Sequence, residues 1–365
     1  MVRGPVVRLL RLETAGFRNL APGGLEFPAR GVVLVGQNGQ GKTNLLEAAS
    51  YPVLFRSFRG ASDAELTRFE APGFRVGIAF HDGRRERSAE AAFQVAGRRK
   101  RLTIDGAEVP RLVDAVGAWL AVAFQPSDVA LASGPAQLRR QYLDRTLALS
   151  DRGYLAALSR YRGALAQRNA ALRQDRRSLA EAFDAPLAAA GSRLVAARLA
   201  WAAQVGELFE AELAALGESG SLALEYVGAA ELAEASAWPQ ALARAADADR
   251  ARRATTIGPH RDDLALRLDG RVLRDYGSTG QQRSAAIVLR LVELVTLERA
   301  RAAVPVLLLD DVFAELDAER QRRLAARLLA GDGGQVLVTA PRTDELPRGL
   351  DLPTWHVSGG EVSKA

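Results

Sequence analysis

The chain of 365 residues contains no cysteine and only three histidines. The absence of cysteine excludes disulfides, thiolate metal sites and cysteine nucleophiles, and it is typical of a cytoplasmic protein. The histidines, His81, His260 and His356, are too scattered to suggest a zinc site. The composition therefore predicts neither a zinc protein nor a disulfide scaffold.

Long apolar runs are also missing. No stretch approaches the roughly 20 apolar residues that cross a membrane. Residues 1–19 alternate apolar side chains with arginines, so they lack the apolar core of a signal peptide. We therefore expect a cytoplasmic protein that does not insert into a membrane.

Lysine is scarce as well. Lys42, Lys100 and Lys364 are the only lysines, and arginine supplies the remainder of the 49 basic residues. An ammonium and a guanidinium are not interchangeable inside a phosphate cradle, so a lysine kept at position 42 points to a required ammonium. The net charge of +6 indicates an anionic partner, and nucleic acid is the commonest partner of a soluble basic protein.

A glycine-rich loop, residues 36–43, follows the apolar run Val32–Val35. Its glycines can adopt the backbone angles that turn successive N–H groups toward phosphate oxygens, and a helix is expected to begin near Asn44. This strand, loop and helix predict a nucleoside triphosphate site with Lys42 on the β- and γ-phosphates and Thr43 on magnesium. The expected ATP-binding residues are Gly36, Gln37, Asn38, Gly39, Gln40, Gly41, Lys42, Thr43 and Asn44.

Two carboxylates follow a second apolar run, Val306–Leu309. Asp310 and Asp311 stand where a P-loop ATPase needs one carboxylate on magnesium and another beside the attacking water. In isolation, a core strand followed by two turn aspartates is the commoner interpretation. The phosphate loop in the same chain favours the ATPase.

A second glycine loop, Tyr276–Ser284, opens a helix upstream of these aspartates. One nucleotide normally occupies one loop, so a second phosphate-binding helix N-terminus needs an explanation. The spacing resembles the signature loop of ABC-type ATPases, which contacts the γ-phosphate held by the opposite subunit. The string Glu315-Leu316-Asp317 matches the loop that bridges the two sites in such dimers. We therefore expect an ATP-dependent homodimer with Ser278, Thr279, Gly280 and Gln281 in the trans signature loop and Asp317 in the bridging D-loop.

Hydrophobic periodicity predicts the elements of the fold. Helical spacing dominates from Gln137 to Leu216, with breaks near Gly163 and around Pro186, and a long helix is expected over Gln281–Arg301. Short strands, separated by Gly, Pro and Asp turns, are expected on both sides of the helical stretch. They are Val6–Leu12, Leu25–Phe27, Val32–Val35, Phe74–Phe80, Ala89–Val95, Arg101–Ile104, Ser221–Val227, Asp263–Leu268 and Val304–Leu309.

A helical segment between two strand-rich blocks predicts one nucleotide-binding head assembled from both chain ends. We expect residues 1–136 and 254–365 to form this head. Residues 137–253 are expected to form a largely helical arm on the signature-loop side.

Several longer strings closely resemble the bacterial RecF family. They span most of the chain, and two of them are absent from transporters. The strings are Phe17-Arg18-Asn19-Leu20, Pro126-Ser127-Asp128-Val129 through Gly134-Pro135 to Arg139-Arg140 and Tyr142-Leu143-Asp144, Gly258 to Leu264, Gly277 to Arg283, and Leu309 to Asp317.

The resemblance implies an α/β fold, an ABC-type P-loop ATPase head with a mixed sheet, an antiparallel β-subdomain and an inserted helical arm, related to SMC heads. RecF proteins bind DNA with ATP, dimerise around two nucleotides, and work with RecO and RecR to place RecA on single-stranded gaps. The resemblance therefore implies a role in recombinational DNA repair and replication-gap processing after DNA damage, in the SOS response. It also implies a weak, DNA-stimulated ATPase used as a switch, with ATP and Mg²⁺ as cofactors and RecR as a partner.

Roles are carried over by match of position. Lys42, Asp311 and Gln125 are the expected catalytic residues, and Asp311 would orient the attacking water. Thr43, Asp310 and Gln125 are the expected metal-site residues, because Gln125 follows an apolar run and would sense both the γ-phosphate and magnesium. Arg59 would contact the adenosine side of the nucleotide, or equally be a solvated surface arginine.

Three positions depart from the pattern. Ser127 stands where the family usually has an acidic residue, and Thr339 occupies the place of the ABC switch histidine. Asp311 stands where most ABC ATPases have glutamate, although aspartate there is normal for RecF. A shorter carboxylate and no histidine predict weaker general-base and γ-phosphate-sensing steps, and hence slow hydrolysis suited to a timed switch.

Three basic runs are candidates for DNA contact, although a charge run is more often a solvated face. No aromatic residue is interleaved with these arginines, which favours backbone contacts to duplex over a base-stacking groove. Sequence-independent and strongly salt-sensitive binding is therefore expected, to duplex DNA or to a junction of single and double strands. The runs are Arg84-Arg85 with Arg87, Arg98 to Arg101, and Arg139-Arg140.

Two other classes of protein share parts of this pattern. A cytoplasmic ATPase subunit of a membrane transporter would share the loops and the twin carboxylates, but it would normally carry the switch histidine. A P-loop kinase acting on a small molecule would have no role for the Ser278 loop or for Asp317. Failure of DNA to affect ATP turnover would favour the transporter, and activity without a dimer would favour the kinase.

Overall fold

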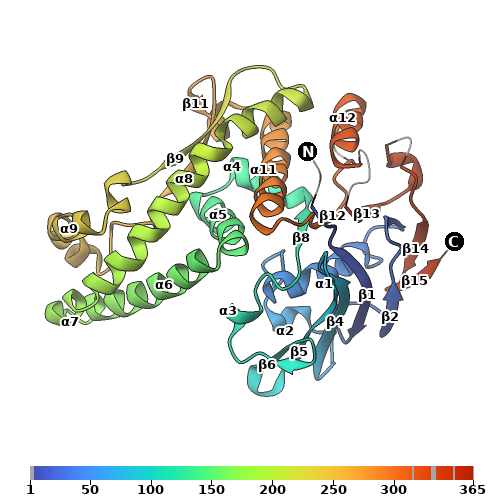
Figure 1. The fold of residues 1–365 in the computed structure, drawn as a ribbon, viewed down its shortest axis with the longest axis horizontal. Coiled ribbons are helices and arrows are strands. Elements are labelled where there is room, and N and C mark those ends of the chain that lie inside the picture. Colours follow the sequence, from blue (N-terminus) through green and yellow to red (C-terminus); the bar gives the residue numbers. More distant parts are fainter. Residues whose placement is uncertain (1–3, 315, 330–333, 348–349, 365) are drawn as a thin grey trace. The chain divides into compact units, whose positions relative to one another are not determined.

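The computed structural model describes residues 4–314, 316–329, 334–347 and 350–364. The chain forms two compact units, shown in Figure 1. The first unit, called the head below, consists of Met1–Asp128 and Glu293–Ala365. The second unit, called the arm, consists of Val129–Val292. Each unit is described by itself.

A mixed sheet with the strand order β15-β14-β3-β13-β12-β8 forms the centre of the head. Its strands come from both ends of the chain, and β3 pairs with β13 on one side and β14 on the other. Neighbouring strands are parallel except β14 and β15. All residues of β3, β8, β12 and β13 are buried, which explains their continuous apolar sequences. The strands are β3 (Gly31–Val35), β8 (Ala121–Phe124), β12 (Val306–Leu309), β13 (Val336–Ala340), β14 (Thr354–Ser358) and β15 (Glu361–Lys364).

A second sheet of the head is antiparallel and has the order β2-β1-β4-β5-β6-β7. Buried and more exposed residues alternate along much of β5, as expected for a sheet with one face on the core. The expected strands in the first third of the chain are thus confirmed, with small differences at their ends. They are β1 (Arg8–Ala15), β2 (Gly23–Glu26), β4 (Gly73–His81), β5 (Glu86–Gln94) and β6 (Arg99–Ile104), followed by the short β7 (Ala107–Glu108).

Helix α1, Lys42–Leu54, contacts strands of both sheets. The indole Nε1 of Trp119 donates a hydrogen bond of 3.1 Å to the carbonyl of Ala49. Phe17, Tyr51 and Phe74 pack edge to face, with ring centroids 5.3 to 6.2 Å apart. Because such pairs add about 0.5–1.5 kcal/mol each beyond their burial, the helix that follows the phosphate loop is firmly held. The other helices of the head are α2 (Asp63–Leu66), α3 (Leu112–Ala115) and α12 (Ala318–Leu329).

The arm combines helices with a small antiparallel sheet of order β11-β10-β9. Its long helices α6 and α8 contact one another. The helix α11, Thr279–Arg301, begins among arm residues and ends among head residues. The remaining elements are α4 (Ala130–Ser133), α5 (Ala136–Ser150), α6 (Arg152–Arg173), α7 (Arg177–Glu181), α8 (Asp184–Leu216), β9 (Leu222–Val227), α9 (Trp238–Arg252), β10 (Asp263–Leu268), β11 (Arg271–Val272) and α10 (Leu273–Tyr276).

Helix α6 runs without interruption, so the expected break near Gly163 is wrong. A Cβ on Gly163 would meet no atom within 4 Å, and packing against α8 offsets the roughly 1 kcal/mol by which glycine weakens a helix. The expected break around Pro186 is confirmed, because α7 ends at Glu181 and α8 begins at Asp184. Pro186 lies in the first turn of α8, where its missing N–H is not needed.

The division into units also differs from the expected one. Residues 129–136 and 254–292, expected in the head, lie in the arm. The cause is non-local pairing, since β10 pairs with β9 over its whole length. Among the described helices, none is both long and apolar enough to span a bilayer.

Candidate nucleotide-binding site

The phosphate loop links β3 to α1 as the sequence predicts, although α1 begins at Lys42 rather than near Asn44. Gly39 and Gly41 have φ angles of 82° and 115°, in the left-handed region that favours glycine. Gly36 is required for another reason, because a Cβ there would lie 2.2 Å from the carbonyl oxygen of Val357. The loop therefore has the backbone shape that points N–H groups at an anion.

The side chain of Lys42 is folded over this loop. Its Nζ donates to the carbonyl oxygens of Gly36 at 2.5 Å and Gln37 at 3.1 Å, and the residue is only 4% exposed. An ammonium held at the mouth of a ring of backbone N–H groups is placed to bind phosphate oxygens. Gln37 and Asn38 are exposed at the loop surface.

The turn between β14 and β15 holds the loop from its other side. Gly359 N–H donates to Oε1 of Gln40 at 2.6 Å, and Gly360 N–H donates to the Gln40 carbonyl at 2.8 Å. These contacts join segments about three hundred residues apart, and nothing in the sequence near Gln40 predicts them.

Thr43 and Asp310 meet, as the sequence predicts. The hydroxyl of Thr43 donates to Oδ1 of Asp310 at 2.8 Å, across 267 positions of sequence. No group of three or more His, Cys, Asp or Glu side chains that could hold a metal occurs in the described residues. A hydroxyl and one carboxylate nevertheless fit Mg²⁺, which takes few protein oxygens and completes its shell with phosphate oxygens and water.

Asp310 is 6% exposed, and burial raises its pKa above the ordinary value. The hydrogen bonds from Thr43 and Thr339 lower this pKa and so oppose the effect of burial. The negative charge of Asp311 raises the pKa further, and the positive charge of Arg59 lowers it. The low dielectric of the site thus favours a counter-charge beside Asp310, such as a metal ion.

Asp311 has a φ angle of 46°, which is uncommon for a residue other than glycine. Its backbone N–H donates to Oγ1 of Thr339 at 2.9 Å, and the same hydroxyl lies 2.9 Å from Oδ1 of Asp310. Thr339 therefore contacts both members of the twin aspartates. The sequence identified Thr339 only as the place of a missing histidine, so this role was not predicted.

Gln125 follows β8 directly, and Asp310 follows the neighbouring strand β12. The pairing of Leu309 with Phe124 puts these two polar residues at the same end of adjacent parallel strands. Gln125 is 7% exposed, and its backbone N–H donates to Oδ2 of Asp128 at 2.9 Å. Ser127 lies beside it, with Oγ 3.5 Å from Oε1 of Gln125.

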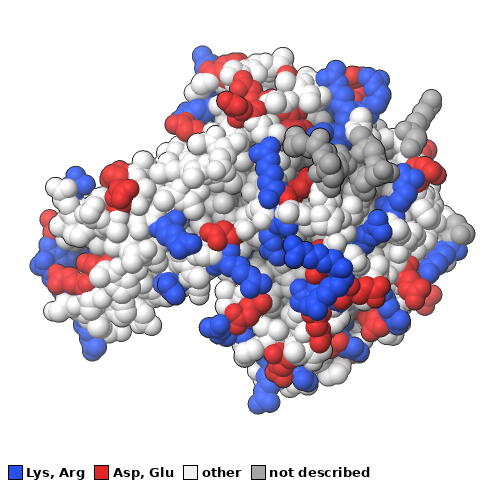
Figure 2. Space-filling view, viewed as in Figure 1, with Lys and Arg blue, Asp and Glu red and all other residues white. Residues whose placement is uncertain are grey.

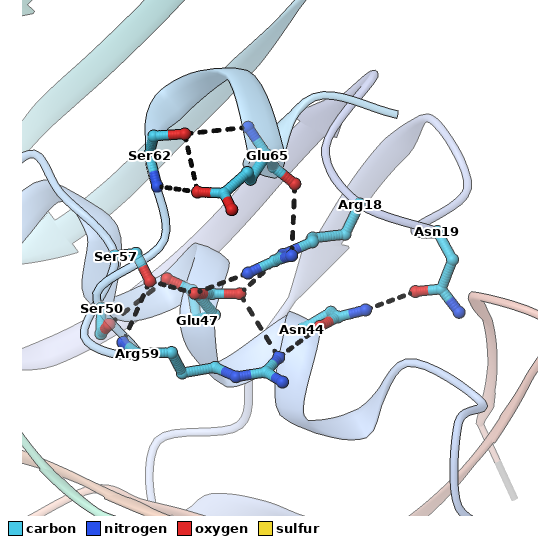
Figure 3. Close-up of polar contacts among 9 residues, drawn as sticks. All are labelled: Arg18, Asn19, Asn44, Glu47, Ser50, Ser57, Arg59, Ser62 and Glu65. Atoms are coloured by element: carbon cyan, nitrogen blue, oxygen red, sulfur yellow. Dashed lines mark hydrogen bonds and ion pairs between the residues drawn. The ribbon is translucent and has the colours of Figure 1, made fainter. Parts of the chain in front are cut away.

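Arg59 belongs to a polar network around Glu47 (Figure 3). Glu47 is fully buried on α1 and accepts hydrogen bonds from Arg18 Nε at 3.0 Å and from Ser57 Oγ at 2.5 Å. Arg59 Nη1 lies 3.8 Å from the same carboxylate and donates to Oδ1 of Asn44 at 3.2 Å. The network therefore connects Arg59 to the first turns of the helix that follows the phosphate loop.

Asn19 extends this network to the loop itself (Figure 3). Its Oδ1 accepts from Asn44 at 2.8 Å, while its Nδ2 donates to the carbonyl of Gly39 at 3.2 Å. Arg18 and Asn19 come from the opening string that supported only a family resemblance. Their structural role, and that of Glu47, was missed by sequence reasoning.

The Ser278 loop lies in the arm, at the start of α11. Ser278 N–H donates to Oε1 of Gln281 at 2.9 Å, and Gln281 N–H donates back to Oγ of Ser278 at 3.2 Å, a reciprocal cap. Ser278 and Thr279 are exposed, and Gly280 is partly exposed. This exposure leaves the loop accessible to a ligand.

Asp317 caps the beginning of α12. Its Oδ1 accepts the Arg320 N–H at 2.9 Å, and this bond, with the charge of Arg320, lowers the pKa of Asp317. Glu315, the first residue of the expected bridging string, lies outside the described residues. The coupling role of Asp317 stays a prediction.

The basic runs are largely engaged with carboxylates. Arg139, one of the candidates for DNA contact, is 6% exposed and binds Asp263 through two hydrogen bonds of 2.8 Å, so its charge is already paired within the arm. Arg140 donates to the carbonyl of Asp262. Figure 2 shows basic and acidic side chains interspersed over most of the visible face. In the other two runs, most basic side chains form ion pairs: Arg85 and Arg87 with Asp105, Lys100 with Asp63, and Arg101 with Glu108. The side chains of Arg84, Arg98 and Arg99 are exposed and have no partner among the described residues.

The chain is similar over its full length to curated proteins named DNA replication and repair protein RecF. The protein from Geobacter sulfurreducens is 37% identical over 377 residues, covering 98% of this chain and 100% of the relative. The protein from Myxococcus xanthus is 36% identical over 374 residues, covering 98% and 97%. No protein-family model matches the chain.

Solved structures agree with these relatives. A structure of the recombination mediator protein RecF with ATP, in the RecFOR pathway, has a TM-score of 0.90 and 28% identity, covering 100% of this chain and 99% of that one. An Smc head domain from Pyrococcus furiosus has a TM-score of 0.58 at 16% identity, covering 98% and 96%, which shows the fold alone. The expected ABC-type ATPase head with a mixed sheet, an antiparallel sheet and inserted helices is confirmed.

Proposed function

Because the chain belongs to the RecF family, it is an ATP-binding protein of DNA replication and repair, and we propose that it is an ATP-driven DNA clamp with slow turnover. In the cytoplasm it would help RecO and RecR place RecA on single-stranded gaps. The observation that carries this proposal is the 2.8 Å contact between Thr43 Oγ1 and Asp310 Oδ1. It joins the phosphate loop after β3 to a carboxylate at the end of β12, two strands away in the same sheet. ATP hydrolysis requires such an arrangement, and a chance glycine turn does not produce it.

The head would bind one nucleotide. Lys42 would exchange its hydrogen bonds to loop carbonyls for bonds to phosphate oxygens, which are stronger acceptors because they are charged. Thr43 and Asp310 would hold Mg²⁺, which when bound neutralises charge on the β- and γ-phosphates. Gln125 would face the same end of the nucleotide from the adjacent strand. Arg59, which donates a hydrogen bond to Asn44 beside the phosphate loop, would contact the nucleotide on its adenosine side.

Asp311 would orient the attacking water and accept its proton. Its short side chain and the absence of a histidine at position 339 support slow hydrolysis. Stimulation of this weak ATPase by DNA is part of the proposal. Slow hydrolysis would let the nucleotide-bound state persist long enough for partner proteins to act.

The Ser278 loop would act on the nucleotide of a second copy. Ser278, Thr279, Gly280 and Gln281 begin a long helix whose N-terminus favours negative charge, and a single chain needs only one phosphate loop for one nucleotide. Asp317 would couple the two sites. The matching relatives and structures give no support to the transporter alternative, and it is not proposed further.

DNA would contact arginines whose charge is not already paired. Arg84, Arg98 and Arg99 meet this criterion among the described residues of the three basic runs. Contacts of this kind are made to phosphates, so they carry no sequence information. We therefore keep duplex or junction DNA as the proposed partner, bound without sequence preference.

The test is the mass of the protein in solution, measured by light scattering with and without Mg-ATP. Wild type and the control Ser159→Arg, an exposed serine on α6, are expected to dimerise only with Mg-ATP. Ser278→Arg is expected to bind nucleotide and stay monomeric. A wild-type protein that remains monomeric with ATP bound at micromolar concentration would contradict the clamp and favour the kinase alternative.

A further inference from the structure

Tyr276 is exposed to an unusual degree for an aromatic residue. It is 64% exposed, and only Phe69 among the described aromatic side chains is similarly exposed, at 89%. Its hydroxyl has no hydrogen-bond partner within the described ranges. Tyr276 is the last residue of α10 and lies two residues before Ser278. Single exposed apolar side chains are common on protein surfaces, but this ring lies two residues from a proposed nucleotide contact.

Arg271 lies against this ring. Its guanidinium carbon is 5.2 Å from the ring centroid, within the range of a cation–π contact. The neighbouring Arg274 pairs with Asp275 at 3.1 Å, whereas Arg271 forms no ion pair with a described carboxylate. The ring and the unpaired guanidinium together form a flat, positively charged surface.

The backbone fixes Tyr276 relative to the Ser278 loop. A Cβ on Gly277 would lie 2.4 Å from Leu273 Cδ1 and 2.8 Å from the Leu273 carbonyl oxygen, so the chain passes too close for any other residue. Gln282 Nε2 donates to the carbonyls of both Arg274 and Gly277 at 3.1 Å. Tyr276 is therefore held in place rather than carried on a loose turn.

We propose that Tyr276 stacks on the base of the nucleotide held by the partner subunit, with Arg271 supporting the ring. This inference rests on the proposed ATP-dependent dimer. Two residues of extended chain span at most about 7 Å. With the γ-phosphate at Ser278, the Tyr276 ring therefore lies close to the same nucleotide. With such a stack, the base of the nucleotide bound to the partner subunit would stabilise the dimer in addition to its triphosphate.

The test compares dimer dissociation constants in saturating Mg-ATP and in saturating Mg-ribose 5′-triphosphate, which has no base. Tyr276→Ala is expected to weaken the ATP dimer about thirtyfold or more, because the homodimer loses two aromatic–base stacks. With the base-free triphosphate, Tyr276→Ala and wild type are expected to agree within about twofold, because no stack exists to be lost. Tyr276→Phe keeps the ring and is expected to behave as wild type, as is the exposed-aromatic control Phe69→Ala.

Two further measurements separate a contact across the dimer from other roles. In the monomeric Ser278→Arg background, adding Tyr276→Ala is expected to leave ATP affinity unchanged, since the contact is made to the partner's nucleotide. Arg271→Ala is expected to weaken the ATP dimer in the same base-dependent way, by a smaller factor.

Each other outcome overturns the inference. An equal loss of dimerisation with ATP and with the base-free triphosphate would show a structural role for Tyr276. Unchanged dimerisation would show that the ring contacts no base, and a loss confined to single-stranded DNA binding would assign it to DNA. A wild type that does not dimerise would overturn the proposed function itself, whereas a wild-type dimer that is indifferent to Tyr276 overturns only this inference.

Discussion

The hydroxyl of Thr339 lies 2.9 Å from Oδ1 of Asp310 and accepts the backbone N–H of Asp311 at 2.9 Å. Thr339 is on β13, and the two aspartates follow the neighbouring parallel strand β12. The side chain is 1% exposed, so both contacts are made in a protected environment. In this chain the residue at the position of the switch histidine holds the twin aspartates in place.

Thr339→Val keeps the shape of the side chain and removes its hydroxyl. The Asp311 N–H then loses its acceptor, and Asp310 loses a donor. We expect ATP turnover to fall about tenfold or more, because a hydrogen bond to a charged group contributes about 1.5–3 kcal/mol. Steady-state kcat and KM measure the effect, and Thr339→Ser, which keeps the hydroxyl, should retain most of the turnover. A valine variant with normal kcat would show that Thr339 does not position the aspartates.

The phosphate loop, Lys42, Thr43 and the aspartates could be predicted from the sequence because their chemistry is local. A loop that binds phosphate needs glycine at positions of left-handed φ, and Gly39 and Gly41 have such angles. Strands β3 and β12 could be predicted for a related reason, since continuous apolar runs indicate buried parallel strands. The buried strands β8 and β13 have apolar runs of the same kind but were not predicted as strands.

The contacts made across the sequence could not be predicted in this way. Glu47 looks like a solvated carboxylate on a helix until Arg18 and Ser57 are brought to it by the fold. Arg139 looks like part of a basic run until β10 brings Asp263 beside it. The boundary between head and arm was misplaced for the same reason, because strand pairing over long separations leaves no local signal.

Asp310→Asn should stabilise the nucleotide-free protein while abolishing Mg-dependent turnover. Burial raises the pKa of Asp310, so the folded state binds this proton more tightly than the unfolded chain. Ionised Asp310 therefore lowers the free energy of unfolding at pH values above its folded-state pKa. This loss disappears when the pH falls below the pKa that Asp310 has in the unfolded chain.

Melting curves without metal or nucleotide measure this directly. At neutral pH the asparagine variant should melt above wild type, and the difference should shrink as the pH is lowered. An asparagine variant that melts below wild type at neutral pH would show that ionised Asp310 is net stabilising.

Alanine variants of Glu47 and Arg59 should have different effects, the first on folding stability and the second on nucleotide binding. Glu47→Ala leaves Arg18 without its buried partner and should lower the free energy of unfolding by about 3–5 kcal/mol. Arg59 is 45% exposed, and its distance to Glu47 is 3.8 Å, so Arg59→Ala should cost less than about 1 kcal/mol while weakening ATP binding. Urea denaturation and nucleotide titration measure the two effects, and a large loss of stability in the Arg59 variant would contradict this division.

Arg139 and the pair Arg98 and Arg99 should differ in how they affect DNA binding. Arg139→Ala breaks a buried bidentate ion pair with Asp263 and should cost about 3–5 kcal/mol of stability. The exposed Arg98 and Arg99 have no described partner, so their alanine variants should unfold as wild type does.

The slope of log affinity against log salt gives the second readout. Each phosphate contact removed lowers the magnitude of this slope by about 0.9 for duplex DNA. The double variant Arg98→Ala/Arg99→Ala should therefore lower it by about two and weaken binding equally for unrelated sequences. Arg139→Ala, measured at a temperature where it remains folded, should leave the slope unchanged. A reduced slope in the Arg139 variant, with none in the double variant, would place the DNA on the arm side of the molecule and overturn this assignment.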